Sequence, residues 1–141
     1  MELISKTFAE LDTVTLYRIL QLRVDVFVVE QECAYPEIDG RDPEPGTVHV
    51  YAQDGGEIVG YLRILEDQDG KARIGRVLTA KQARGTGLGG QLMRKALEII
   101  GDRPSVLDAQ SHLVGFYETF GFTASGESYV EDGIPHTPMA R

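Results

Sequence analysis

Cysteine and tryptophan are almost missing from this chain of 141 residues, which has one Cys and no Trp. Because Cys33 has no second cysteine to pair with, an intrachain disulfide and a cysteine-clustered zinc site are both excluded. A chain of this kind is typical of a reducing compartment, so we expect a cytoplasmic protein. No stretch approaches the roughly 18 apolar residues of a membrane span, and the first residues lack the pattern of a secretory signal. We therefore expect no membrane partner.

Basic residues are also scarce. The 14 Lys and Arg residues stand against 22 Asp and Glu, which gives a formal net charge of -8 and a pI of about 4.8. This is the wrong sign for binding phosphate backbones over a wide surface, so we expect no nucleic-acid partner. With 42% hydrophobic and 26% charged residues, the composition is that of an ordinary globular protein. We expect a single domain over residues 1–141.

The charge is distributed unevenly along the chain. From Glu30 to Asp69 there are eleven acidic and two basic residues, a balance of -9. From Lys71 to Arg103 there are eight basic and two acidic residues, a balance of +6. This asymmetry indicates two differently charged faces, one suited to a cation and one to an anion, although solvated loops would give the same pattern.

The first half of the chain predicts a helix and an antiparallel sheet. The run at 3–8 fits an edge strand, and Asp12 or Thr13 can cap the helix that follows. Arg23 interrupts the apolar face of that helix, and we expect its side chain to snorkel at the edge of the core. After a long loop at 33–46, rich in Pro and Gly, turn signals separate three β-like runs, which predicts a meander of 47–53, 58–65 and 72–78.

The second half predicts helices alternating with strands. An apolar stripe indicates a helix at 88–100 that ends at Gly101, and 106–109 reads as a buried strand. Ser111 can cap a short helix at 112–120. The tail holds two weaker strand candidates, around Gly126 and after Pro135.

A glycine-rich loop, Arg84 to Gly90, lies between the meander and the helix at 88–100. Its bare backbone N–H groups at a helix start form an anion cradle. The loop matches the dinucleotide pattern G-x-G-x-x-G by count, but that pattern should open directly from a strand, and here residues 80–83 intervene. A P-loop is excluded because Gly90 is followed by Gln91 where Lys is required.

The same loop, read as Arg84-x-x-Gly87-x-Gly89, resembles the acyl-CoA pyrophosphate loop of the GNAT superfamily of N-acyltransferases. The segment 116–122, Phe-Tyr-Glu-Thr-Phe-Gly-Phe, resembles the F-Y-E-x-x-G-F motif of that family at the expected distance. Further matches at 20–31, 35–42 and 131–136 make the chain similar to the ElaA-like branch. The resemblance implies an α/β (α+β) GNAT fold, with a mixed, mostly antiparallel sheet of six to seven strands and about four helices.

The resemblance also implies acetyl-CoA as cosubstrate and no metal. The pantetheine arm would pair with Val77, Leu78 and Thr79, and Gln110 stands where the family often has Asn before its last motif. The pyrophosphate would lie on the backbone amides of the glycine loop: Arg84, Gly85, Thr86, Gly87, Leu88 and Gly89. Lys81, Arg84 and Arg94 supply positive charge near this loop, and which of them would touch phosphate is left open.

The implied reaction is direct attack of a primary amine on the thioester in a ternary complex. Tyr117 matches the general acid of the family, although a tyrosine in a short helix can equally be part of the core. The general base is open, because Gly75 occupies the strand position that often carries Glu. The candidates for the base are His112, which can equally be a capping or surface residue, and also Glu30, Asp39 and His136. Glu30, Asp39 and His136 could instead bind the substrate.

Two other functions compete with this hypothesis. One is a regulatory module that binds acyl-CoA and has lost catalysis. The presence of Tyr117, which matches the catalytic acid of the family, speaks against it. The other is an acyl-homoserine lactone synthase, whose Arg-x-x-x-Phe element is echoed by Arg23 and Phe27, and whose spaced acids are echoed by Glu37, Asp39 and Asp42. The missing Trp and the short chain speak against it. The expected partner is a small-molecule or peptide amine, and an exposed tail strand could pair two subunits in a homodimer.

Overall fold

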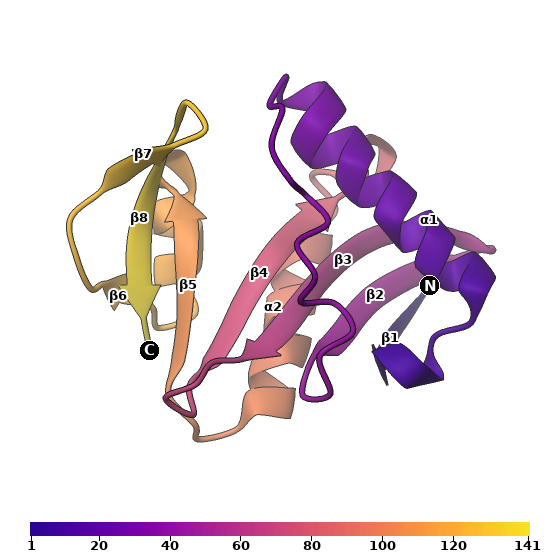
Figure 1. Ribbon diagram of the computed structural model, residues 1–141, viewed down its shortest axis with the longest axis horizontal. Helices are drawn as coiled ribbons and strands as arrows, with labels where there is room; N and C mark the ends of the chain where they lie inside the picture. Colours follow the sequence, from indigo (N-terminus) through magenta and orange to yellow (C-terminus); the bar gives the residue numbers. More distant parts are fainter.

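The computed structural model describes residues 1–141, which build one eight-stranded sheet with helices on both faces (Figure 1). The sheet order is β1-β2-β3-β4-β5-β8-β6, with β7 paired to β8. The strands are β1 (Glu2–Thr7), β2 (Val48–Asp54), β3 (Glu57–Glu66), β4 (Ala72–Thr79), β5 (Ser105–Gln110), β6 (Thr123–Ala124), β7 (Tyr129–Glu131) and β8 (Ile134–Ala140).

There are three α-helices, of which the first two are long and the third is short. They are α1 (Thr13–Val24), which continues as a π-helix at Asp25–Glu30, α2 (Leu88–Ile100) and α3 (Val114–Glu118). Short 3₁₀ turns lie at Phe8–Glu10, Lys81–Ala83 and Ser111–Leu113. None of these helices has the length and apolar character needed to cross a bilayer.

The predicted meander is confirmed, because β1 to β4 pair antiparallel with their neighbours in chain order. Gly55 and Gly56 form the two-residue turn between β2 and β3, and both have positive φ, 57° and 90°. Such a turn matches the right-handed twist of the strands that it joins, and glycine adopts its backbone without strain.

The sheet divides between β4 and β5. These strands run parallel but pair only at Ala72 with Ser105 and at Arg73 with Val106. From Ile74 onward, β4 has no strand partner on this edge, and β5 instead pairs antiparallel with β8. In Figure 1 the two strands diverge from a common lower end, which leaves one edge of β4 without a neighbouring strand.

Two hydrophobic clusters hold the helices on opposite faces of the sheet. The larger places Leu92, Met93 and Ala96 of α2 against residues of β2 to β5. The smaller places Ile19 of α1 against side chains that include Tyr61. Successive residues of a strand point to opposite faces, and β2 accordingly sends Val50 and Tyr51 to different clusters.

Four expectations from the sequence need correction. The sheet has eight strands rather than six or seven, because the tail contributes β6, β7 and β8, and there are three α-helices rather than about four. Ser111 does not cap a helix over 112–120, since its hydroxyl bonds to Thr137 at 2.9 Å and α3 spans only Val114–Glu118. Arg23 does not snorkel, because it is 0% exposed and ion-paired inside the protein.

Candidate active site

A cavity of about 780 Å³ lies where β4 and β5 separate. One side is β4 from Ile74 to Thr79, and the other includes Leu107, Gln110 and Tyr117. The π-helix after α1, the loop at 33–46 and the hairpin of β7 and β8 complete the walls. The cavity therefore collects residues from most of the chain around the open edge of β4.

The wall that β4 contributes to the cavity is a strand edge with a β-bulge. Val77, Leu78 and Thr79, the residues predicted to pair with pantetheine, all line the cavity. Just before them, Arg76 has a φ of +53°, and β4 carries one residue more than β3 between the pairs Arg63–Gly75 and Tyr61–Leu78. Gly75 also lines the cavity, and only open space lies where its Cβ would be, so this position supplies no base.

The predicted anion cradle is the start of α2. Gly87 is the N-cap residue in the left-handed conformation, with φ of 84°, and no side chain caps the helix. The first backbone N–H groups of α2 therefore lack a side-chain acceptor, as an anion site requires. Leu88 is buried in the core, so only its backbone can contact a ligand. Of the six predicted loop residues only Arg84 lines the cavity, and the other five lie outside its lining.

Arg84 links this loop to the opposite wall. Its two terminal nitrogens donate to both carboxylate oxygens of Glu30, at 2.9 and 3.0 Å, and its Nε donates to the carbonyl of Thr79 at 3.2 Å. The guanidinium thus occupies the end of the β4 edge. The pair is partly exposed, with 39% of the Arg84 side chain and 29% of the Glu30 side chain accessible, and such pairs are weak.

Tyr117 lines the cavity from α3 and is only 6% exposed. The ring of Phe116 packs against it edge to face at 5.1 Å, and the Tyr117 hydroxyl makes no hydrogen bond within the protein. Burial raises the pKa of Tyr117 to about 12. The phenol is therefore protonated at every physiological pH and has a free donor in the cavity.

Both predicted histidines line the cavity in different settings. His112 is exposed and makes no hydrogen bond with the protein. His136 has its Nδ1 2.8 Å from the carbonyl of Ile134 and stacks on Tyr129 with ring centroids 5.7 Å apart. Gln110 also lines the cavity and donates to Gln31 at 3.2 Å.

The two predicted acidic residues, Glu30 and Asp39, line the cavity but are already paired with arginines. Asp39 binds Arg63 in a very short contact and lies 3.4 Å from Arg76. Burial favours the neutral acid, but the hydrogen bonds from Arg63 and from the Arg41 amide, together with the charges of Arg63 and Arg76, outweigh this effect and hold the pKa of Asp39 well below its usual range.

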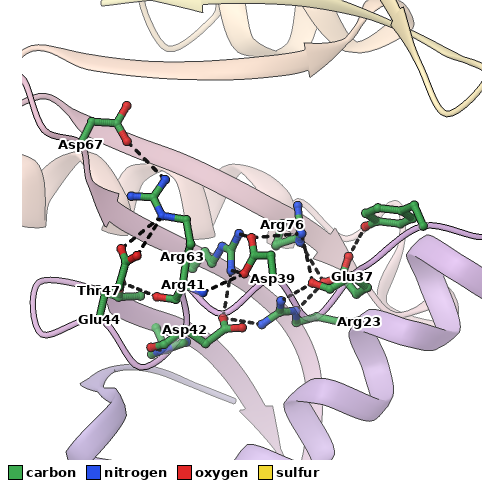
Figure 2. Close-up of polar contacts among 12 residues, drawn as sticks. Arg23, Glu37, Asp39, Arg41, Asp42, Glu44, Thr47, Arg63, Asp67 and Arg76 are labelled. Carbon is green, nitrogen blue, oxygen red and sulfur yellow. Dashed lines mark hydrogen bonds and ion pairs between the residues drawn. The ribbon is translucent and has the colours of Figure 1, made fainter.

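Beside the cavity lies a buried network of ion pairs that was not predicted from the sequence (Figure 2). Arg23 donates to Glu37 at 2.7 Å and to Asp42 at 2.6 Å, and Arg63 reaches Asp42 at 3.1 Å. An arginine on an apolar helix face, followed by acids in a loop, was the signal that could have revealed it. Arginines therefore neutralise much of the acidic segment that seemed free for a cation.

Glu131 and Asp132, in the hairpin of β7 and β8, were also missed. Both line the cavity, both are exposed, and neither forms an ion pair. They are the cavity carboxylates that are free to meet a positively charged ligand. The structure contains no cluster of three or more His, Cys, Asp or Glu side chains placed to hold a metal ion.

A sheet that divides beside a cavity, a helix start capped by glycine and a buried tyrosine in the cavity wall are the features expected of an acyl-CoA-dependent acyltransferase, and the family comparison supports that class. The model of the Acetyltransferase (GNAT) domain matches residues 18–141, and the chain belongs to this family.

Proteins similar to this chain agree with that assignment. Protein ElaA of Escherichia coli is 46% identical over 139 residues, which cover 94% of this chain and 91% of ElaA. The crystal structure of ElaA has a TM-score of 0.94 and covers 99% of this chain and 98% of its own, at 44% identity. An acyl-CoA N-acyltransferase from Pseudomonas aeruginosa, also 44% identical, has a TM-score of 0.95 and covers 100% of this chain and 99% of its own.

A more distant likeness concerns one competing hypothesis. The CoA-dependent acyl-homoserine lactone synthase BjaI, solved with SAM and isopentyl-CoA, has a TM-score of 0.78 over 98% of this chain and 80% of its own. At 19% identity this likeness shows the fold alone.

Proposed function

We propose that the protein transfers an acetyl group from acetyl-CoA to a primary amine, by direct attack of the amine on the thioester in a ternary complex. The observation that carries the proposal is the convergence of three features on one cavity. These are the unpaired edge of β4, Arg84 at the start of the glycine loop, and the free hydroxyl of Tyr117. Attack of a neutral amine on a thioester needs no metal, and we propose none.

Two parts of the chain would bind the cosubstrate. The backbone of Val77, Leu78 and Thr79 would pair with the pantetheine arm, and the N–H of Leu78 would stabilise the oxyanion that forms on the acyl carbon. The diphosphate would lie on the amides from Arg84 to Gly89, at the positive end of α2. Arg84 would then leave the carbonyl of Thr79 and turn to the phosphates.

Tyr117 would donate its proton toward the departing thiolate. Because its pKa is about 12 and that of a thiol is about 8.5, complete transfer to a free thiolate would be unfavourable. The phenol would therefore donate a hydrogen bond to the sulfur and give up its proton only as the C–S bond breaks, while a base takes the proton of the attacking nitrogen and afterwards returns a proton to the phenolate. His112, exposed in the cavity and without a partner, is our proposed base.

The acceptor would enter beside the free carboxylates. Glu131 and Asp132 would attract the cationic form of a small-molecule or peptide amine before it loses its proton. Glu30 would join them once Arg84 has moved, and Asp39 and His136 would line the same space.

We place the reaction in the cytoplasm, without a nucleic-acid or membrane partner. The exposed strand β7 offers an edge for a homodimer.

The test is a screen of polyamines, amino acids, aminoglycosides and peptide N-termini with acetyl-CoA, read by thiol release and by the mass of the acceptor. We expect release of CoA in step with N-acetylation of at least one amine class. If acetyl-CoA binds but no acceptor is modified, the regulatory-module hypothesis replaces this one. Formation of an acyl-homoserine lactone with acyl-CoA and S-adenosylmethionine would instead favour the synthase.

A further inference from the structure

Arg76 adopts a backbone conformation that arginine rarely takes. Its φ of +53° lies in the left-handed region, at the point where β4 carries an extra residue opposite β3. Glycine is the usual residue in such a bulge, because any Cβ is strained there. A strained residue persists only where its surroundings hold it, and such residues concentrate at functional sites.

The side chain of Arg76 is held by the loop at 33–46. Its Nε donates to Oε2 of Glu37 at 2.8 Å, and its Nη2 donates to the carbonyl of the same residue at 3.0 Å (Figure 2). Its guanidinium also lies over the ring of Tyr35, 5.6 Å from the centroid. Glu37 therefore accepts hydrogen bonds from Arg76 through both its side chain and its backbone.

Glu37 is in turn fixed from α1. The Nε of Arg23 donates to the same Oε2 at 2.7 Å, and its Nη2 donates to the same carbonyl at 3.2 Å. Arg23 is 0% exposed, and the hydroxyl of Tyr35 bonds the other carboxylate oxygen of Glu37. Two arginines thus bind one residue from opposite sides, which connects α1 to the bulge of β4 through Glu37.

The bulge matters because it lies within the open edge of β4, directly before Val77, Leu78 and Thr79. Successive backbone groups of a strand normally alternate in direction, and an extra residue interrupts this alternation. The conformation of Arg76 therefore determines which amides of Val77, Leu78 and Thr79 face the cavity.

We propose that the contact between Glu37 and Arg76 is a positioning device that holds the left-handed bulge and so sets the β4 edge for the acyl thioester. This inference rests on the proposed function. Arg76 is then a positioning residue, whose guanidinium need not touch the substrate.

Replacing Arg76 by glycine and by alanine separates the backbone from the side chain. Both changes remove the contact with Glu37, but only Arg76→Gly leaves a residue that adopts positive φ without strain. We expect Arg76→Ala to weaken acetyl-CoA binding about 5- to 10-fold by calorimetry and to lower turnover about 10-fold. Arg76→Gly should stay within about 3-fold of the wild type, and Arg76→Asn, which tolerates this region, should lie between them.

Two results would overturn the inference. If alanine and glycine reduce turnover equally, the guanidinium itself acts on the substrate; if neither has an effect, the contact is dispensable. A wild-type protein that binds no acetyl-CoA would instead refute the proposed function. Hydrogen exchange of the β4 amides would still test the bulge in that case, with faster exchange expected in Arg76→Ala than in Arg76→Gly and equal exchange counting against the inference.

Discussion

At the scale of single residues, burial sets the chemistry of Tyr117. Its pKa of about 12 means that the phenol keeps its proton well beyond the range in which a free tyrosine of pKa about 10 would lose it. We therefore expect turnover to show no loss of the acid between about pH 8 and pH 10. A pH–rate profile of kcat checks this, and a fall with a midpoint near pH 9 that Tyr117→Phe removes would contradict it.

His112 tests the other half of the proton transfer. If it takes the proton of the amine, His112→Ala should lower kcat about 100-fold, within the usual range for a general base, and should remove the acidic limb of the pH–rate profile. His136→Ala is the comparison, because this ring is held by Ile134 and Tyr129 on the proposed acceptor side, and its loss should raise the KM of the amine and leave the acidic limb in place. An acidic limb that survives in His112→Ala would exclude this role.

At the scale of elements, the proposed diphosphate site lies between the start of α2 and the end of β4. Gly87 and Gly70 both have a φ of +84°, but only Gly87 caps α2, whereas Gly70 lies in the turn between β3 and β4. Alanine at either position should cost about 1 kcal/mol of stability. Only Gly87→Ala should also weaken acetyl-CoA binding, by about 10-fold in calorimetry, and equal weakening by both variants would argue against the anion cradle.

The ion pair of Glu30 and Arg84 should compete with the cosubstrate. Removing its acid in Glu30→Gln frees Arg84, and an exposed pair is worth about 0.2–1 kcal/mol, so acetyl-CoA should bind about 1.4- to 5-fold more tightly. The amine should show a higher KM in the same variant. Glu57→Gln, at the exposed first residue of β3, is the control, and weaker acetyl-CoA binding in Glu30→Gln would contradict this competition.

The sequence predicted these elements well where local rules decide them. The meander follows from its turn glycines, and α2 follows from its apolar stripe and from Gly101, its C-cap with a φ of 67°. The short helix after β5 was misjudged because Ser111 bonds across the sheet to Thr137, a contact far away in the chain. The burial and ion pairing of Arg23 were not predicted for the same reason, since its partners Glu37 and Asp42 come from a loop without periodicity.

The candidate site was predictable in its motifs but not in its charges. The glycine loop and Tyr117 are short patterns with their own chemistry, and β4 follows from its place before the loop. No local pattern shows that Arg63 and Arg76 would bind Asp39, or that Glu131 and Asp132 would stay unpaired. Pairing of charges depends on which distant elements meet, and only the fold determines that.

At the scale of the whole molecule, the buried ion network ties α1, the loop at 33–46 and the central strands together. Burial alone would raise the pKa of Asp42, but its hydrogen bond to Arg23 and the charges of Arg23 and Arg63 outweigh that and lower it. The pKa of Asp39 is lowered in a similar way. Both carboxylates therefore stabilise the fold above their unfolded pKa of about 3.9, and this contribution is lost as the pH falls below it.

Removing one charge of the network should be costly. Asp42→Asn leaves Arg23 and Arg63 short of a buried counter-charge, and we expect the free energy of unfolding to drop by about 3–5 kcal/mol at neutral pH. It should also make stability less sensitive to pH below about 4. Urea unfolding at several pH values measures both effects, with Asp69→Asn in an exposed turn as the control. A loss below about 1 kcal/mol would show that the network is dispensable.

We propose that this molecule, a member of an acyltransferase family, moves an acetyl group from acetyl-CoA to an amine with Tyr117 as the acid. The most direct test compares the wild type with Tyr117→Phe on the best acceptor of the screen, with Tyr17→Phe on the exposed face of α1 as the control. We predict one N-acetylated amine per CoA released, and a kcat about 100-fold lower in Tyr117→Phe at unchanged acetyl-CoA affinity. Turnover that is equal in both proteins, or acetyl-CoA binding without transfer to any amine, would contradict the account.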